Sequence, residues 1–212
     1  MIIDPNLKIC LITPPDIGSP DLFYPRFEEA LSHGIRFVQF RNKQLTKKEG
    51  FRVASRLSEL CRQYRSLFIV NDEIDMALAL DSDGIHIGQQ DFPLDLTRNL
   101  MGPGKIIGVS THSFQQAAEA ESGGADYIGF GPVFYTPSKE NRDRVSLETL
   151  KLIRKEVAIP IFAIGGISPT NVSSIFAAGA SGIAVIFSIW NEPSVGKAVD
   201  KLQQEIQNLT RS

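Results

Sequence analysis

Short apolar runs alternate with longer amphipathic segments along the whole chain, and this alternation limits the fold more than any other feature of the sequence. The apolar runs are rich in β-branched and aromatic residues, and each is followed by a segment with helical periodicity. Strands are predicted over residues 7–13, 37–41, 67–71, 84–87, 106–110, 127–130, 161–164 and 182–186. Helices are predicted over residues 24–33, 47–64, 73–80, 94–101, 114–122, 147–156, 171–178 and 195–209. The pattern predicts parallel strands joined by helices, at a spacing of roughly 25 residues.

Eight strand-helix units predict a closed parallel barrel, in which the helices cover the outside of the strands. The alternative is an open, doubly wound sheet, which usually has fewer strands and begins with a Gly-x-Gly-x-x-Gly turn. No such turn follows the first predicted strand. A chain of 212 residues is also the right size for one domain. We therefore expect an α/β fold, a single small (β/α)8 TIM barrel, with residues 1–212 as one domain.

Charge and composition exclude several classes of function. The formal net charge of −2 argues against a nucleic-acid-binding protein that works by bulk electrostatics. The amino end lacks the features of a signal peptide, and no apolar run approaches the roughly 20 residues of a membrane span. Cys10 and Cys61 are the two cysteines and lack metal-site spacing, which indicates a reducing compartment. We therefore expect a cytoplasmic protein that binds neither nucleic acid nor membranes.

Two acidic side chains follow neighbouring predicted strands. Asp72 comes directly after the strand over 67–71, and Asp91 follows the strand over 84–87. The carboxyl ends of parallel strands lie at one rim of a barrel, and two carboxylates that meet there repel each other unless a cation lies between them. A hard cation such as Mg²⁺ accepts one or two carboxylates and leaves its other positions to water and substrate phosphates. The alternative is that Asp72 caps a helix and Asp91 lies in a turn.

Basic side chains are also predicted at this rim. Arg41 and Lys43 alternate along an extended segment after the second strand, so both can point to the same side. Arginine offers a planar fork for phosphate oxygens and lysine a point charge. Lys139 lies in the longest loop, within Thr-Pro-Ser-Lys. These groups predict a clamp for a polyanion, although surface solvation and ordinary turn composition would also explain them.

A second phosphate environment is predicted after strands seven and eight. Gly165 and Gly166 follow the seventh strand, and the backbone of Ile186 and Phe187 follows the eighth. These are the usual positions of a phosphate cradle in barrels, because glycine lets backbone N–H groups approach an oxyanion closely. The alternative is a plain turn. Together the two environments predict two phosphorylated substrates, a diphosphate beside the cations and a monophosphate beside the glycines.

The histidines and aromatic residues are less informative. His86, on the fourth strand, is predicted either as a wall of the pocket or as a hydrogen-bonded core residue. His112 follows the fifth strand and is a candidate acid or base. Phe130, Phe134 and Tyr135 are candidates for stacking on a flat heterocycle, although core packing is the commoner role of such residues.

Several motifs occur in order along the chain and resemble those of one family. They are VQFRNK (38–43), ND (71–72), GIHIGQQD (84–91), GVSTH (108–112), GFGPVF followed by TPSK (129–139), and AIGGI (163–167). The chain resembles the thiamine-phosphate synthase family from the first strand to the eighth. The resemblance implies a small (β/α)8 barrel that joins hydroxymethylpyrimidine diphosphate to thiazole phosphate and releases diphosphate, with Mg²⁺ as cofactor. It also implies a dissociative reaction, in which diphosphate leaves before the thiazole nitrogen captures a pyrimidine-methyl cation.

The resemblance assigns roles to particular residues. It implies that Asp72 and Asp91 hold Mg²⁺ and that Gln39 lies near the pyrimidine. The expected diphosphate ligands are Arg41, Lys43, Asn71 and Lys139, and Ser110 would face the pyrimidine or the diphosphate. The expected thiazole phosphate ligands are Thr136, Ser138, Gly166, Ile186 and Phe187. The residues expected to act in catalysis are Arg41, Lys43, Ser110 and Lys139.

Two positions depart from the family pattern. Phe187 stands where the family usually has serine, which removes a hydroxyl contact to the thiazole phosphate. Arg144 and Val145 stand where the family tends to have glycine. The rival functions are a TenI-type thiazole tautomerase, with His112 as its acid-base group, and a non-catalytic barrel that binds a phosphorylated ligand. The combined diphosphate clamp favours the synthase, and the sequence leaves open whether the protein forms a homo-oligomer.

Overall fold

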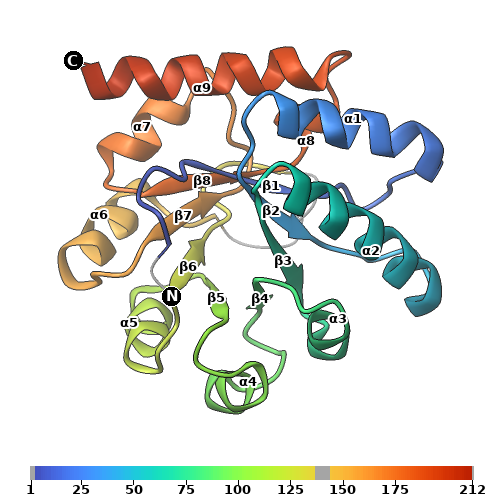
Figure 1. The fold of residues 1–212 in the computed structure, drawn as a ribbon. Coiled ribbons are helices and arrows are strands. Elements are labelled where there is room, and N and C mark those ends of the chain that lie inside the picture. The colour runs from blue at the N-terminus through green and yellow to red at the C-terminus, as the bar shows by residue number, and fades with distance from the viewer. Residues whose placement is uncertain (1–2, 137–143, 212) are drawn as a thin grey trace.

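The computed structural model describes residues 3–136 and 144–211, and its centre is a closed barrel of parallel strands. Each strand pairs with its neighbours in the order of the chain, and β8 closes the barrel on β1 (Figure 1). The strands are β1 (Ile9–Ile12), β2 (Phe37–Phe40), β3 (Leu67–Asn71), β4 (Gly84–Ile87), β5 (Ile106–Thr111), β6 (Tyr127–Phe130), β7 (Ile161–Ile164) and β8 (Gly182–Val185). This confirms the predicted TIM barrel.

The helices lie around the outside of the barrel (Figure 1). They are α1 (Pro20–Ser32), α2 (Lys47–Gln63), α3 (Ile74–Ala79), α4 (Leu94–Met101), α5 (Phe114–Ser122), α6 (Leu147–Glu156), α7 (Val172–Ala177), α8 (Phe187–Trp190) and α9 (Val195–Arg211). Polar side chains begin several of them. The hydroxyls of Thr46, Ser113 and Ser146 accept hydrogen bonds from backbone N–H groups in the first turns of α2, α5 and α6. No helix in the described ranges is both long and apolar enough to span a membrane.

Two hydrophobic cores stabilise the barrel. The larger one packs the outward side chains of the strands against the helices. The smaller one fills the barrel interior, where Phe37, Tyr127 and Phe162 pack edge to face with ring centroids 5.2 to 5.6 Å apart. These three rings lie near the amino ends of their strands, so they plug that half of the barrel. The cavity inside the barrel therefore opens at the carboxyl end of the strands.

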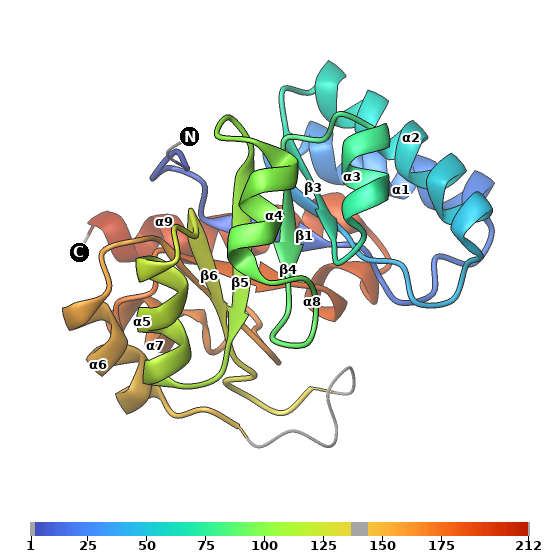
Figure 2. The ribbon, with the colours of Figure 1, turned by 90° about the horizontal axis from the view of Figure 1, so that it is seen from below.

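The loops at the carboxyl end of the strands build one face of the molecule. Figure 2 shows the loops after β4 and β6, together with α8, at the end opposite the N-terminus. The cavities described below lie among residues of this face.

The structure differs from the sequence predictions at two places. The first helix begins at Pro20 rather than near residue 24, because proline fits the first turn of a helix, where its missing N–H has no partner to lose. The eighth strand ends at Val185, and the predicted loop after it contains the one-turn helix α8. This short helix packs Ile189 and Trp190 into the core, and the Trp190 indole N–H donates to the Ile12 carbonyl at 2.7 Å.

Candidate active site

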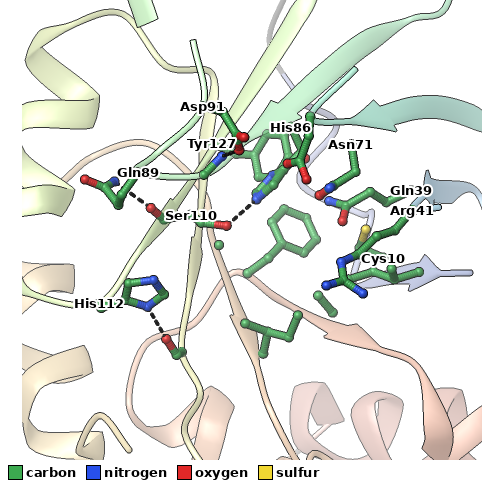
Figure 3. A pocket seen from close by; sticks show the side chains of 18 of the residues that line it. Cys10, Gln39, Arg41, Asn71, His86, Gln89, Asp91, Ser110, His112 and Tyr127 are labelled. Atoms are coloured by element: carbon green, nitrogen blue, oxygen red, sulfur yellow. Dashed lines mark hydrogen bonds between the residues drawn. The ribbon is translucent and has the colours of Figure 1, made fainter. Parts of the chain in front are cut away.

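A cavity of about 400 Å³ opens at the carboxyl end of the barrel, directly above the aromatic plug. Tyr127 (Figure 3) forms part of its floor, and Phe162 also lines it. The structure brings together here the predicted residues Gln39, Arg41, Lys43, Asn71, Asp72, Asp91, Ser110 and Ile186. Residues separated by more than a hundred positions therefore converge on one space, as strand ends in a barrel do.

Acidic and basic side chains meet on one side of this cavity. The Lys43 ammonium lies 3.0 Å from a carboxylate oxygen of Asp72. Asp72 has a left-handed backbone, with φ of 65°, directly after β3. Its N–H donates to the His86 carbonyl at 2.9 Å, which holds this turn in place. An unusual conformation that the surroundings enforce is common at functional sites, and here it aims Asp72 toward the cavity mouth.

Asp91 lies beside Asp72 across the end of β4. Its carboxylate accepts the Gly88 N–H at 2.7 Å. Partial burial of the carboxyl group raises the pKa of Asp91, although the residue as a whole is exposed, and the Gly88 hydrogen bond opposes this rise. A hydrogen bond and the charge of Asp72 raise this pKa further. The two carboxyl groups therefore share one small volume, as the prediction from the strand ends required.

This acid pair suits a hard divalent cation. The described residues contain no group of three or more His, Cys, Asp and Glu side chains of the kind that forms an all-protein metal cage. Mg²⁺ needs no such cage, because it is commonly held by one or two carboxylates and completed by water and substrate phosphates. The oxygen donors of Asp72 and Asp91 and the nearby cations match that mode of binding.

Arg41 is held from below by Thr13, a fully buried residue that follows β1. The Thr13 hydroxyl accepts the Arg41 N–H at 2.8 Å and donates to the Arg41 carbonyl at 3.1 Å. Burial lowers the pKa of the Arg41 guanidinium, and the charge of Asp72 opposes that effect. Arg41 remains charged, because arginine keeps its proton in proteins. A partly desolvated guanidinium on a fixed backbone is well suited to bind a phosphate.

The floor of the cavity carries a polar network that joins three strands. The two ring nitrogens of His86 lie 2.9 Å from the Tyr127 hydroxyl and 2.9 Å from the Ser110 hydroxyl (Figure 3). Burial raises the pKa of Tyr127 well above its usual value, so the phenol stays protonated, and a side-chain hydrogen bond from Gln39 opposes the rise. Of the two predicted roles of His86, both hold: it lines the cavity and is a buried, hydrogen-bonded residue.

Two glycines make room for this network. A Cβ atom at Gly108 would lie 2.1 Å from the Tyr127 ring, and one at Gly129 would lie 3.1 Å from the His86 ring. Tyr127 was absent from the predicted site, although a signal for it exists. Inward positions of neighbouring strands alternate between large and glycine residues, which is how small barrels fill their interior.

His112 also lines the cavity, after β5. Its Nδ1 lies 2.5 Å from the Gly131 carbonyl, which can only accept, so Nδ1 carries a proton (Figure 3). The backbone N–H of His112 donates to the Gln116 side-chain oxygen at 2.7 Å. The Gly131 carbonyl thus helps to orient the ring.

A smaller cavity of about 90 Å³ lies between the loops after β7 and β8. It is lined by Thr136, Ile164, Gly165, Gly166, Ile167, Ala184, Val185, Ile186, Phe187 and Ser188. Thr136, Gly166, Ile186 and Phe187 were the described residues predicted to form the second site. Ile164, Ala184 and Ile186 line both cavities, so the two spaces share a wall.

Some predicted residues cannot be placed. Ser138 and Lys139 lie in 137–143, outside the described residues. Just after this stretch Arg144 is exposed, and the Val145 N–H donates to the Pro132 carbonyl at 2.9 Å. The position where the family tends to have glycine is therefore tied to the loop after β6.

Comparisons with known proteins agree with this geometry. The chain is 48% identical over 163 residues to a thiamine-phosphate synthase of Shouchella clausii, covering 76% of this chain and 78% of that one. It is 41% identical over 182 residues to a thiamine-phosphate synthase of Synechocystis sp., which covers 86% of this chain. The chain spans about half the length of that relative, 53%.

A solved structure and a family model extend the likeness. A thiamine phosphate pyrophosphorylase from Pyrococcus furiosus superposes with a TM-score of 0.85 at 35% identity, covering 96% of each chain. The family model described as thiamine monophosphate synthase matches residues 9–189, from β1 to α8. The chain belongs to the thiamine monophosphate synthase family.

Proposed function

We propose that this chain is a thiamine-phosphate synthase, which joins hydroxymethylpyrimidine diphosphate to thiazole phosphate and releases diphosphate. One observation carries the proposal. A charged cavity and a small neutral cavity open side by side at the same barrel rim and share an apolar wall. A transferase that uses a diphosphate and a monophosphate needs two such environments within reach of each other.

The charged side of the large cavity suits departure of diphosphate. We assign Arg41, Lys43 and Asn71 to the diphosphate, together with Lys139. Asp72 and Asp91 would hold Mg²⁺, which when bound would neutralise charge on the leaving group. Thr13 holds the backbone of Arg41 and Asp72 pairs with the Lys43 ammonium, so these two cations need little reorganisation as charge develops. Such preorganised charge is usually the largest contribution to catalysis of this kind.

The floor of the cavity suits the pyrimidine ring. Gln39 and Ser110 supply the polar contacts in this proposal, and Phe162 gives a flat apolar surface. His86 touches Ser110 from behind and fixes its hydroxyl, so it acts as a positioning residue. The charged groups on the other side of the cavity fit a reaction driven by leaving-group stabilisation.

The small cavity would receive the thiazole phosphate. Gly166, Ile186 and Phe187 line it beside Thr136, and Ser138 completes the proposed set. A thiazole whose phosphate occupies this space would extend past the shared wall into the large cavity. Its ring nitrogen would then face the pyrimidine methylene carbon once diphosphate has left.

The setting of the enzyme completes the proposal. We assign residues 1–212 to one catalytic barrel domain that acts on small molecules, not on nucleic acid or membranes. Cys10 and Cys61 are both free and buried, which suits a reducing compartment such as the cytoplasm. Homo-oligomer formation is a separate question that gel filtration with light scattering would answer.

A thiazole tautomerase is the second candidate, because His112 lines the main cavity with its ring held in one orientation. An isomerase would need neither the pyrimidine substrate nor Mg²⁺. The synthase proposal accounts for the cations and the acid pair, and the tautomerase proposal leaves them without a role.

One coupled assay separates these functions. The purified protein is supplied with both substrates and Mg²⁺, and thiamine phosphate is measured. We expect product only when all three are present, and loss of product in Asp91→Ala and Lys139→Ala. Asp95→Ala is the matched control, because Asp95 is an exposed acid in the first turn of α4 that does not line the cavity. Metal-independent isomerisation of a thiazole phosphate carboxylate, without thiamine phosphate formation, would favour the tautomerase instead.

A further inference from the structure

Ser188 lies in α8, one residue beyond the predicted thiazole-phosphate ligands. Its hydroxyl oxygen is buried and has no hydrogen-bond partner, the one such side-chain atom found among residues 3–136 and 144–211. Buried polar groups in native proteins are nearly always paired, so each exception needs a physical explanation. Ser188 lines the small cavity between the loops after β7 and β8. A ligand in this cavity would explain the unpaired hydroxyl.

In the loop after β7, two backbone carbonyls are already hydrogen-bonded, whereas two backbone N–H groups are not. The Gly165 carbonyl accepts the Phe134 N–H at 3.1 Å, and the Gly166 carbonyl accepts the Asn171 side-chain amide at 3.0 Å. The N–H groups of Gly166 and Ile167 donate to no group in the described part of the chain. Gly166 has φ of 60°, and a Cβ there would lie 2.2 Å from the Tyr135 carbonyl, so this backbone requires glycine. The carbonyls of Gly165 and Gly166 are therefore already occupied, whereas the N–H groups of Gly166 and Ile167 are free to donate to a ligand.

The described wall of this cavity carries no charged side chain. An anion bound there must be held by neutral donors, so each donor matters. A hydroxyl can rotate to donate, and a phosphate oxygen can only accept. The cavity volume of about 90 Å³ is well above the ~10–15 Å³ that one water needs, so the cavity has room for more than a single water.

We infer that the Ser188 hydroxyl donates a hydrogen bond to the monophosphate group of the substrate in this cavity. This inference rests on the proposed function, which assigns a phosphorylated thiazole to the same space. Ser188 then completes a set of neutral donors with the N–H groups of Gly166 and Ile167. Its contribution goes to phosphate recognition and not to the stability of the fold, because the hydroxyl has no partner within the described protein.

The test compares Ser188→Ala with a matched control, Ser55→Ala. Ser55 is a half-buried serine of α2 whose hydroxyl donates to the Phe51 carbonyl at 2.8 Å, and it lines neither cavity. Calorimetry gives the Kd of each protein for thiazole phosphate, for the dephosphorylated thiazole alcohol and for inorganic phosphate. Urea unfolding gives the stability of each variant.

We expect Ser188→Ala to weaken the affinity for thiazole phosphate roughly tenfold to a hundredfold, which is the range expected for a hydrogen bond to a charged group. Its affinity for inorganic phosphate should fall as well, and its affinity for the alcohol should match that of the wild type. Its stability should be unchanged or slightly higher, because an unpaired buried hydroxyl has been removed. Ser55→Ala should match the wild type in all binding measurements.

Unchanged affinity of Ser188→Ala for thiazole phosphate would overturn the inference, and so would equal losses for the phosphate and the alcohol. A wild-type protein that binds neither thiazole phosphate nor inorganic phosphate would also overturn the inference. The two proposals fail separately. If the protein makes thiamine phosphate and Ser188→Ala keeps the KM for thiazole phosphate, only the Ser188 role fails. If Ser188-dependent phosphate binding is found without thiamine phosphate formation, only the synthase proposal fails.

Discussion

Removal of one oxygen atom from the cavity floor should show how strongly the polar network supports the site. Tyr127→Phe deletes the hydroxyl that lies 2.9 Å from His86 Nδ1 and interacts with the Gln39 side chain. The ring keeps its place against Phe37 and Phe162, so no large cavity forms. The change therefore isolates the hydrogen bonds from the packing.

The expected cost follows from burial. Tyr127 and His86 are both buried, so His86 and Gln39 lose a partner where little water can replace it. A buried polar group left without a partner costs about 1–3 kcal/mol. Water in the cavity above can reach part of the network, so we expect a total loss of about 2 kcal/mol in the free energy of unfolding.

Tyr64→Phe is the control for this change. The Tyr64 hydroxyl bonds the Glu28 carboxylate at 3.1 Å on the surface, where water replaces the lost contact. Urea unfolding should give a loss below about 1 kcal/mol for Tyr64→Phe. In the synthase assay Tyr127→Phe should lower kcat/KM by roughly tenfold, because His86 no longer holds Ser110 in one orientation.

The result that would refute this reasoning is equal stability of the two variants. It would mean that the Tyr127 hydroxyl is as well solvated as a surface phenol, and that the floor network contributes nothing to the fold. A loss of stability without any change in kcat/KM would separate the two roles and leave Ser110 independent of His86.

Four further predictions concern the rim. Gly166→Ala should lower stability by about 1–3 kcal/mol in urea unfolding, because its Cβ would meet the Tyr135 carbonyl at 2.2 Å and its φ of 60° favours glycine. Mg²⁺ affinity, measured by calorimetry, should fall as the pH is lowered, because the protonated acid does not bind metal. The fall should begin at a pH above the usual titration range of aspartate, because the pKa of Asp91 is raised. Without metal, the folded state holds the Asp91 proton more tightly than the unfolded chain does. The free energy of unfolding should therefore fall as pH rises through the raised pKa of Asp91. Asp91→Asn should remove this pH dependence from the urea midpoints. Lys43→Ala should raise the KM for the pyrimidine diphosphate by roughly tenfold in steady-state assays, since a charge-assisted contact is lost.

The fold was predictable because each strand-helix unit has a recognisable local sequence pattern. Residues 67–71, for example, form an apolar run that ends at an asparagine and an aspartate, and the structure places β3 there with Asp72 at the rim. The rule that parallel strands end on one side then brings Asp72 and Asp91 together without knowledge of side-chain packing. The predicted residues that the structure describes therefore line the two cavities, while their chemical roles stay predictions.

Other parts of the site depend on information that local patterns do not contain. Strand alternation points Tyr127 inward, but its partnership with His86 depends on the register between β4, β5 and β6 and on the space left by Gly108. Ser188 escaped prediction for a similar reason. The eighth apolar run was expected to lead into a loop, whereas the one-turn helix α8 brings the next residue after Phe187 to the cavity wall.

The shared wall between the two cavities constrains the orientation of the proposed reaction. Ile164, Ala184 and Ile186 line both spaces, so a molecule that spans them crosses an apolar surface. A thiazole ring suits such a surface, and its phosphate suits the neutral donors of the small cavity. The cations and acids lie on the opposite side of the large cavity, at the ends of β2, β3 and β4, where they would hold diphosphate. The pyrimidine between them would then have its leaving group on one side and the thiazole nitrogen on the other. Capture of the cation after diphosphate departs would need no movement of either ring across the barrel, because the two anionic groups already fix the rings face to face.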